Sequence, residues 1–263
     1  MYDIKTKEGN IMYNVKYQRQ WLKANFNLLD IIETDQKQKL QQPSIQKDVE
    51  DGAEIIELPE VSRDVVIKKD IFDCLMDRKS NRIFTEEALS LKELSFLLYM
   101  TQGIKKVVGK VNFATFRTVP SGGARHPFET YLVVNNVEGL RKGVYRYLAL
   151  EHRLAYLFDE NNLEEKTEDA VSGQKFVAAA PIVFIWSCIP YRSEWRYNVA
   201  AHKTILQDSG HLCENLYLAC EAIGCGTVAI GDYNQDSIDK FLKLDGEDEF
   251  VIYAAPVGKV SSE

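Results

Sequence analysis

Two segments of the chain repeat apolar residues at the spacing of an amphipathic helix. The first spans residues 91–103 and includes Leu91, Leu94, Leu97 and Leu98. The second ends near residue 223 and includes Leu206, Cys213, Leu216, Cys220 and Ile223. The first segment ends at Gly103 and the second is followed by Gly224, and glycine is a typical C-terminal stop signal. The pattern therefore predicts two helices that end just before these glycines.

Six shorter runs are apolar or alternate between apolar and polar residues, and turn residues separate them. They cover residues 128–135, 143–149, 153–158, 181–187, 227–230 and 250–256. Runs of this length and pattern predict strands. A GxGxxG motif is absent from the sequence, which weighs against a dinucleotide-binding Rossmann unit. We expect an α+β fold in which helices flank an antiparallel-rich sheet.

The first 60 residues differ in character from the rest of the chain. They are polar and mixed, with a glutamine-rich run at residues 36–42 that precedes Pro43. The segment between residues 11 and 32 carries apolar side chains, among them Trp21, Leu22 and Phe26. We expect residues 1–60 to form an arm that packs on the body or on a partner subunit, and residues 61–263 to form the main domain.

Composition fits one large domain, or one domain with an arm. The chain has 263 residues, of which 45% are apolar, enough for a sizeable core. The sequence has no run of 18 apolar residues, and its start lacks the pattern of a signal peptide, so we expect no membrane span and a cytoplasmic location. A net charge of −7 argues against general affinity for nucleic acid.

The cysteines and histidines do not suggest a metal site. The five cysteines are odd in number and form no CxxC pair: Cys74, Cys188, Cys213, Cys220 and Cys225. The four histidines are widely dispersed. We expect reduced, buried thiols and no bound metal.

The loop 118–127 concentrates small residues and two glycines between two strand-like runs. Gly122 and Gly123 permit positive φ and a close approach of the backbone, and Ser121 offers a hydroxyl. Arg125 offers a planar fork suited to phosphate or carbonyl oxygens. A Gly-Gly loop that ends in proline is also typical of a plain turn. The loop is thus either a ligand loop or a plain turn.

A second polar group, Arg78-Lys79-Ser80-Asn81-Arg82, follows a short helical pattern. If the helix continues through it, Arg78 and Arg82 lie four positions apart on one face, with the Ser80 hydroxyl between them. Such a group can clamp a phosphate. It can equally be a solvated basic helix end.

Together with the second helix, its glycine turn at Gly224 and Gly226, and the strand after it, these motifs resemble the nitroreductase family. More narrowly, the chain resembles the SagB-type dehydrogenases, which oxidise azoline rings in ribosomal peptide natural products. The resemblance covers residues from about 71 to 259 and is carried by the arginine-serine-arginine group, the PSGGARHP loop, the GH…EN…A.E..G.G helix and the closing Pro256-Val257-Gly258-Lys259. Residues 33–36 and 55–59 resemble the leader of that group more loosely.

The resemblance implies FMN at a homodimer interface, with both subunits contributing to each site. It assigns Arg78, Ser80 and Arg82 to the phosphate and ribityl chain. It places Pro120, Ser121, Gly122 and Gly123 along the isoalloxazine ring. Gly224 and Gly226 are placed near the ring edge, and Lys259 is a weaker candidate for the phosphate.

The resemblance also suggests a catalytic pair ahead of the long helix. The azoline-oxidising relatives have a Lys-Tyr pair there, and the matching residues in this chain are Arg196 and Tyr197. A guanidinium stays protonated, so Arg196 cannot act as a general base, although it can orient a carbonyl. Tyr197 is the candidate acid or base, or else a packed aromatic. His126 is an open candidate for lining the site, and His211 is expected to be a structural histidine inside the helix.

Three functions follow from this resemblance. The preferred one is an FMN-dependent dehydrogenase of thiazoline or oxazoline rings in a modified peptide, acting with a cyclodehydratase. The second is an NAD(P)H-dependent reductase of nitro or quinone-like compounds, which tolerates Arg196 and needs no protein partner. The third is a flavin-binding scaffold whose catalytic pair has drifted.

Overall fold

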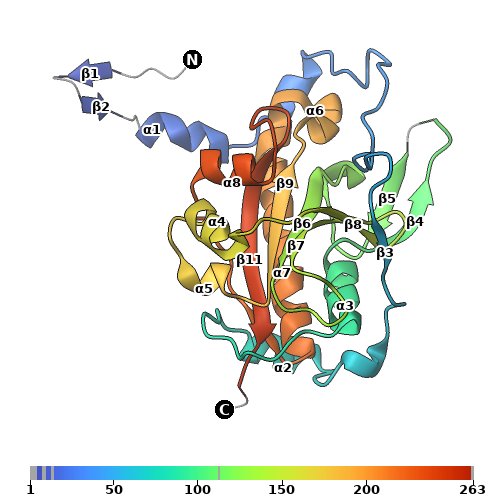
Figure 1. Ribbon diagram of the computed structural model, residues 1–263. Helices are drawn as coiled ribbons and strands as arrows, with labels where there is room; N and C mark the ends of the chain where they lie inside the picture. Colours follow the sequence, from blue (N-terminus) through green and yellow to red (C-terminus); the bar gives the residue numbers. More distant parts are fainter. Residues whose placement is uncertain (1–4, 8–9, 13–14, 112, 262–263) are drawn as a thin grey trace.

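A seven-stranded antiparallel sheet forms the centre of the molecule (Figure 1). The computed structural model describes residues 5–7, 10–12, 15–111 and 113–261. The strands follow the order β10 (Cys225–Thr227), β11 (Phe250–Lys259), β9 (Ile182–Cys188), β6 (Phe128–Val134), β7 (Gly143–Leu148), β8 (Arg153–Phe158) and β3 (Ile55–Glu57), and every neighbouring pair is antiparallel. The predicted α+β fold with an antiparallel sheet and flanking helices is confirmed.

Helices cover both faces of this sheet, which explains why the central strands β6, β7 and β9 are buried along their whole length. One core cluster joins the sheet to α3 (Leu91–Gln102) and α7 (Ala201–Ala222). The other joins it to α4 (Leu163–Ala170), α5 (Lys175–Ala178) and α8 (Gln235–Phe241). Alternate residues of β6 enter the two clusters: Leu132 faces the α7 side, and Tyr131 and Val133 face the α8 side.

The two predicted helices are present, and local signals fix their ends. The Ser90 side chain caps the first turn of α3, Glu93 completes a capping box, and Gly103 follows the last turn. Helix α7 begins at Ala201, five residues before the first residue of its apolar pattern, Leu206. At its other end the chain turns away at Gly224, which has a φ of +70°. Both glycine stops therefore act as predicted.

One predicted strand is displaced. Residues 227–230 were expected to be extended and paired, but β10 ends at Thr227, and beyond it only an isolated bridge joins Ile230 to Ala254. The reason is that the Ala229 N–H donates to the Tyr217 hydroxyl at 2.8 Å instead of to a strand. Val228 and Ile230 still pack in the core on the α8 side.

The remaining strands and α-helices lie at the edges of this body. They are β1 (Lys5–Lys7) paired with β2 (Asn10–Met12), the helices α1 (Val15–Gln18), α2 (Ile71–Asp77) and α6 (Tyr191–Tyr197), and the hairpin β4 (Ile104–Val108) and β5 (Ala114–Arg117). All five cysteines are free and buried, as the sequence predicts. No helix in the described part of the chain has the length and apolarity needed to cross a membrane.

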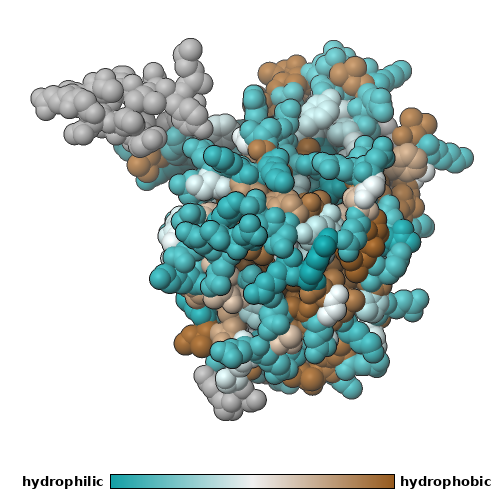
Figure 2. Space-filling model, viewed as in Figure 1, coloured by the Kyte–Doolittle hydropathy of each residue, from teal (hydrophilic) through white to brown (hydrophobic). Residues whose placement is uncertain are grey.

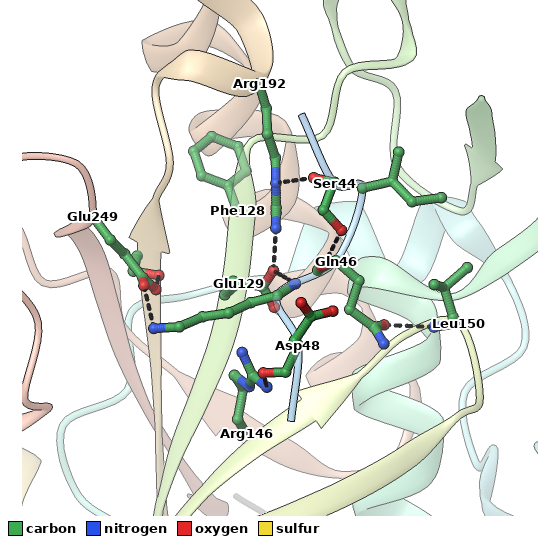
Figure 3. Close-up of polar contacts among 12 residues, drawn as sticks. Ser44, Gln46, Asp48, Phe128, Glu129, Arg146, Leu150, Arg192 and Glu249 are labelled. Carbon is green, nitrogen blue, oxygen red and sulfur yellow. Dashed lines mark hydrogen bonds and ion pairs between the residues drawn. The ribbon is translucent and has the colours of Figure 1, made fainter. Parts of the chain in front are cut away.

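Residues 44–48, here called the strap, run across the end of the sheet and are held by buried side chains of the body (Figure 3). Arg192 Nε donates to the Ser44 carbonyl at 2.8 Å, and the Lys47 N–H donates to Glu129 Oε1 at 2.7 Å. The chain then adds β3 to the sheet edge beside β8. Residues before position 60 thus contact the body, and the boundary between arm and domain at that position stays a prediction.

Candidate functional site

The glycine loop, residues 120–123, is fixed by a carboxylate of α7. The Ser121 hydroxyl donates to Asp208 Oδ2 at 2.6 Å, and the Gly122 N–H donates to the same oxygen at 3.0 Å. Ser121 Oγ in turn accepts the His126 N–H at 2.9 Å. Sequence reasoning missed Asp208, although an aspartate inside an apolar-periodic helix is a signal for such a role. The loop is therefore a braced element with a fixed shape.

Asp208 is ionisable yet almost fully buried, with only 5% of its surface exposed. Burial raises the pKa of its carboxyl, and the hydrogen bonds from Ser121 and Gly122 offset part of that rise. Burying the Asp208 carboxylate therefore costs free energy, and the hydrogen bonds that fix the loop offset part of that cost.

Both glycines of the loop are required by close contacts. Gly123 has a φ of +58°, and a Cβ atom there would lie 2.3 Å from the Tyr197 hydroxyl. A Cβ atom on Gly122 would lie 2.2 Å from Thr204 Cγ2 on α7. The structure thus brings the predicted glycine loop into direct contact with the predicted catalytic tyrosine.

Arg196 and Tyr197 are the last residues of α6, and both are half-buried. The Arg196 guanidinium lies 5.5 Å from the centroid of the Tyr197 ring, and the Phe26 ring meets that ring edge-on at 5.6 Å. A Cβ atom on Gly123 would also lie 3.3 Å from Arg196 Cδ. The pair and the loop therefore form one group, here called the loop group: residues 120–123, Arg196, Tyr197 and Asp208.

Two other polar residues of the loop region are structural. Arg125 is buried, and its Nε and Nη2 donate to the carbonyls of Gly123 at 3.2 Å and Phe113 at 3.1 Å. Its fork therefore binds carbonyl oxygens within the chain. His126 is also buried, with Nε2 3.1 Å from the Thr115 carbonyl oxygen, and burial lowers its pKa to about 3. The suggestion that His126 lines the site is not supported by this placement. His211, expected as a structural histidine, is instead exposed on α7.

The second group gathers around Tyr217, near the end of α7. Helix α2 ends at Asp77, so Arg78 and Arg82 do not share a helical face as the sequence suggested. Arg78 has an extended ψ of 119°, because the chain beyond it runs beside β10, where the Asn81 N–H donates to the Thr227 carbonyl at 2.9 Å.

This direction of the chain brings Ser80 Oγ to 3.0 Å from the Tyr217 hydroxyl and the Arg78 guanidinium to 5.3 Å from the Tyr217 ring centroid. We call Arg78, Ser80, Tyr217, Gly224 and Gly226 the serine group. Gly226 is close to it because a Cβ atom there would lie 2.7 Å from the Asn81 side chain.

Arg82 and Lys259 are neighbours of the serine group, and Lys259 pairs with Cys225 in the sheet, but their side chains make other contacts. Arg82 is exposed and lines a cavity of about 650 Å³ together with Thr85 and Asn136, and neither Arg78 nor Ser80 lines it. Lys259 is paired with Glu93, the capping-box residue of α3, and lies 3.8 Å from Glu87. As placed, Lys259 therefore contacts carboxylates.

The loop group and the serine group lie on opposite sides of α7. Asp208 and Tyr217 are nine residues apart, which corresponds to about 13 Å along the helix and to half a turn beyond two full turns. The side chains thus point in opposite directions around the helix axis. One copy of the chain does not bring all the predicted site residues to one pocket.

Comparisons with known proteins identify the family. The model of the nitroreductase family matches residues 75–259, which is more than half of the chain. MJ1384 of Methanocaldococcus jannaschii, named as a nitroreductase, is 33% identical over 204 residues, covering 78% of this chain and 96% of that protein. The trifolitoxin-processing protein TfxB of Rhizobium leguminosarum bv. trifolii is 32% identical over 133 residues, covering 49% of this chain but only 36% of TfxB.

Solved structures share the fold. A nitroreductase of Ralstonia eutropha JMP134 is 25% identical with a TM-score of 0.64, covering 85% of this chain and 96% of that one. A chain of the Escherichia coli microcin synthetase McbBCD complex with truncated pro-MccB17 bound is 18% identical with a TM-score of 0.58, covering 94% and 91%. A Desulfovibrio desulfuricans nitroreductase in complex with FMN is 18% identical with a TM-score of 0.50, covering 74% and 92%. With the family model and MJ1384 in agreement, the chain belongs to the nitroreductase family, whose members are typically FMN-dependent oxidoreductases.

Proposed function

We propose that this oxidoreductase holds FMN with the loop group and the serine group together. The residues fit such a cofactor. Arg78 and Ser80 offer a cation and a hydroxyl near the surface for the phosphate. The loop glycines let the backbone lie directly against Thr204 and Tyr197, so that the Tyr197 hydroxyl is held beside the loop. FMN supplies hydride transfer when it is bound. The chain would orient the flavin, offer backbone N–H groups to it and provide the Tyr197 hydroxyl beside Gly123.

The arrangement around α7 supports a homodimer with the cofactor at its interface. Since the two groups lie on opposite sides of α7, one copy would supply the loop group and the other the serine group of each site. Helix α2, next to the serine group, also exposes an apolar face: Ile71, Phe72, Leu75 and Met76 are each more than half exposed. Figure 2 shows hydrophobic side chains at the lower edge of the molecule, where α2 lies in Figure 1. Several large apolar side chains exposed on one short helix are typical of an interaction surface.

A charge on α2 should break this dimer. Leu75→Glu is tolerated by the monomer, because Leu75 is 54% exposed, but it places a carboxylate in the proposed interface. We expect light scattering after size exclusion to show a monomer that no longer retains FMN. Leu150→Glu, at a 41% exposed apolar position in the turn between β7 and β8, is the matched control and should leave a dimer with FMN. A Leu75→Glu protein that stays dimeric and yellow would contradict this interface.

We further propose that the substrate is a thiazoline or oxazoline ring in a peptide, processed with a cyclodehydratase partner. The likenesses to TfxB, a toxin-processing protein, and to a chain of the McbBCD complex support this proposal. The observation that carries it is the contact of Tyr197 with the glycine loop. If the flavin lies along that loop, the ionised Tyr197 hydroxyl would accept a ring proton as hydride leaves. A second function, NAD(P)H-dependent reduction of nitro or quinone-like compounds, is favoured by Arg196, which cannot serve as a base.

A spectrum of the purified protein separates these functions. Bound FMN should absorb between about 300 and 550 nm and should bleach under anaerobic conditions with the true hydride donor. We expect bleaching by an azoline-containing peptide, and we expect Tyr197→Phe to slow it by about 100-fold or more while FMN stays bound. Bleaching by NADH or NADPH alone would support the reductase. Retained flavin that no donor bleaches would support a scaffold, and failure to bind FMN would overturn the flavin site.

A further inference from the structure

Arg146 on β7 is a buried arginine whose donors are largely unused. Only 3% of its surface is exposed, and its Nη2 donates to the Asp48 carbonyl of the strap at 2.6 Å (Figure 3). Its Nε and Nη1, which carry three of the five guanidinium N–H groups, have no hydrogen-bond partner in the described chain. Buried charges are normally paired with an opposite charge, so this guanidinium lacks a counterpart.

Other buried arginines of the body show what the usual arrangement is. All three nitrogens of Arg117 donate, to Thr115, Gln102 and Ile45. Arg192 forms an ion pair with the buried Glu129. Arg146 forms no ion pair with any carboxylate of the described residues. In the same part of the chain, Arg192 Nη1 also has no hydrogen-bond partner, but Arg192 has its carboxylate, whereas Arg117 has no carboxylate but uses all three nitrogens. Of these three arginines Arg146 alone has neither, which points to a negatively charged group that comes from outside the chain.

A pocket of about 320 Å³ lies where such a group would bind. Arg146 lines it together with Tyr131, Tyr156 and Phe158 of the neighbouring strands, and residues 47–53 form its outer wall. Because the unpartnered nitrogens are shielded by their surroundings, a ligand reaches them only if that wall moves. Lys47 and Asp48 are held by Glu129 and Arg146, so the part of the wall that can move is residues 50–52, which are exposed and form a turn at Gly52 with a φ of +80°.

The charges around the pocket restrict the ligand further. Asp48, Glu50 and Asp51 are exposed at its rim. Of the two lysines, Lys47 is paired with Glu249 at 2.5 Å, and Lys243 Nζ lies 4.0 Å from the centroid of the Phe158 ring. The site thus combines a buried cation with an acidic rim. A matching ligand has an anionic end for Arg146 and hydrogen-bond donors at its other end.

We propose that this pocket binds a small organic anion, a carboxylate or a phosphate ester, whose outer end carries hydroxyl or amino groups. The site is separate from the proposed flavin site. Arg146 shares its side of the sheet with Val144 and Tyr131, on the face covered by α4, α5 and α8, whereas α7 packs on the opposite face. The proposal therefore stands whether or not the flavin site is as described.

Titration of the FMN-loaded protein tests the proposal. Acetate, inorganic phosphate and glycine serve as probes against chloride at equal ionic strength, and the melting temperature and the heat of binding are measured. We expect saturable binding of at least one probe with a Kd of about 1 mM, and a loss of at least tenfold in Arg146→Gln. Acetate and glycine report a carboxylate site, and phosphate reports a phosphate site. Arg153→Gln, an exposed arginine on the neighbouring β8, is the control and should bind as the unchanged protein does.

A second measurement does not depend on the variant being folded. Crystals of the unchanged FMN-loaded protein soaked in selenate should give an anomalous peak within hydrogen-bond distance of Arg146 Nε or Nη1, and acetate or glycine should displace it. Equal binding in Arg146→Gln, no binding of any probe, or selenate found only elsewhere would overturn the proposal.

Discussion

Replacing Arg192 by methionine should lower the free energy of unfolding by about 3–5 kcal/mol. Arg192 and Glu129 form an ion pair at 2.5 Å, and both side chains are at least 96% buried. Without the guanidinium, the Glu129 carboxylate would stay buried, with the Lys47 N–H as its remaining hydrogen-bond donor among the described residues. The strap would also lose the bond from Arg192 to the Ser44 carbonyl. The loss is large because an uncompensated buried charge costs far more than the pair itself contributes.

Denaturant unfolding of FMN-free protein measures this effect, and two further variants make it specific. Arg153→Met removes a cation from an exposed pair with Glu57 and should cost at most about 1 kcal/mol. The double variant Glu129→Met with Arg192→Met removes both charges and should recover much of the loss. Hydrogen exchange at the Lys47 amide should rise in Arg192→Met alone. Equal losses in Arg192→Met and Arg153→Met would show that the strap is not held by this pair.

The strap shows why part of the fold could not be predicted from the sequence. Helices α3 and α7 and strands β6 to β9 were predictable because their apolar spacing and glycine stops are local signals. The strap has no such periodicity, and its order comes from Arg192, Glu129 and Arg146, which lie about 80 to 150 positions away. In a sequence, buried arginine and glutamate look like surface residues. Only the folded structure shows that they face the backbone of residues 44–48.

The candidate site divides in the same way. The nearness of Tyr197 to the glycine loop follows from the family resemblance and is seen in the structure. The role of Asp208 in fixing the loop was not predicted, because the residue lies within an apolar helical pattern. The end of α2 at Asp77 was not predicted either, because it depends on pairing of the following chain with β10. The opposite placement of the two groups around α7 was readable in principle, because nine residues correspond to half a turn. To make that prediction, however, one must already know that Asp208 contacts the glycine loop and that Tyr217 contacts Ser80.

Asp208→Asn should weaken FMN binding by about 10- to 100-fold, because it removes charge-assisted hydrogen bonds worth about 1.5–3 kcal/mol. The carboxylate accepts both the Ser121 hydroxyl and the Gly122 N–H. An asparagine oxygen at the Oδ2 position would accept both bonds without the negative charge, and its NH₂ group would replace Oδ1, which lies 3.2 Å from the Gly122 N. The glycine loop would then lose the fixed shape that we propose lies along the flavin. Fluorescence quenching of FMN on titration with apoprotein measures the affinity.

The same substitution should not weaken the FMN-free fold, which separates a role in binding from a role in stability. Burial raises the pKa of Asp208 in the folded state, so its contribution to stability is largest when it is protonated and falls as the pH rises above about 4. Asparagine removes that pH dependence, and stability at neutral pH should stay level or rise. Asp239→Asn is the matched control, because Asp239 is equally buried with a pKa raised by burial, but it bonds Gln235 and Val251 on the α8 side of the sheet. FMN affinity unchanged in Asp208→Asn, or reduced equally in Asp239→Asn, would mean that Asp208 supports the fold and not the cofactor.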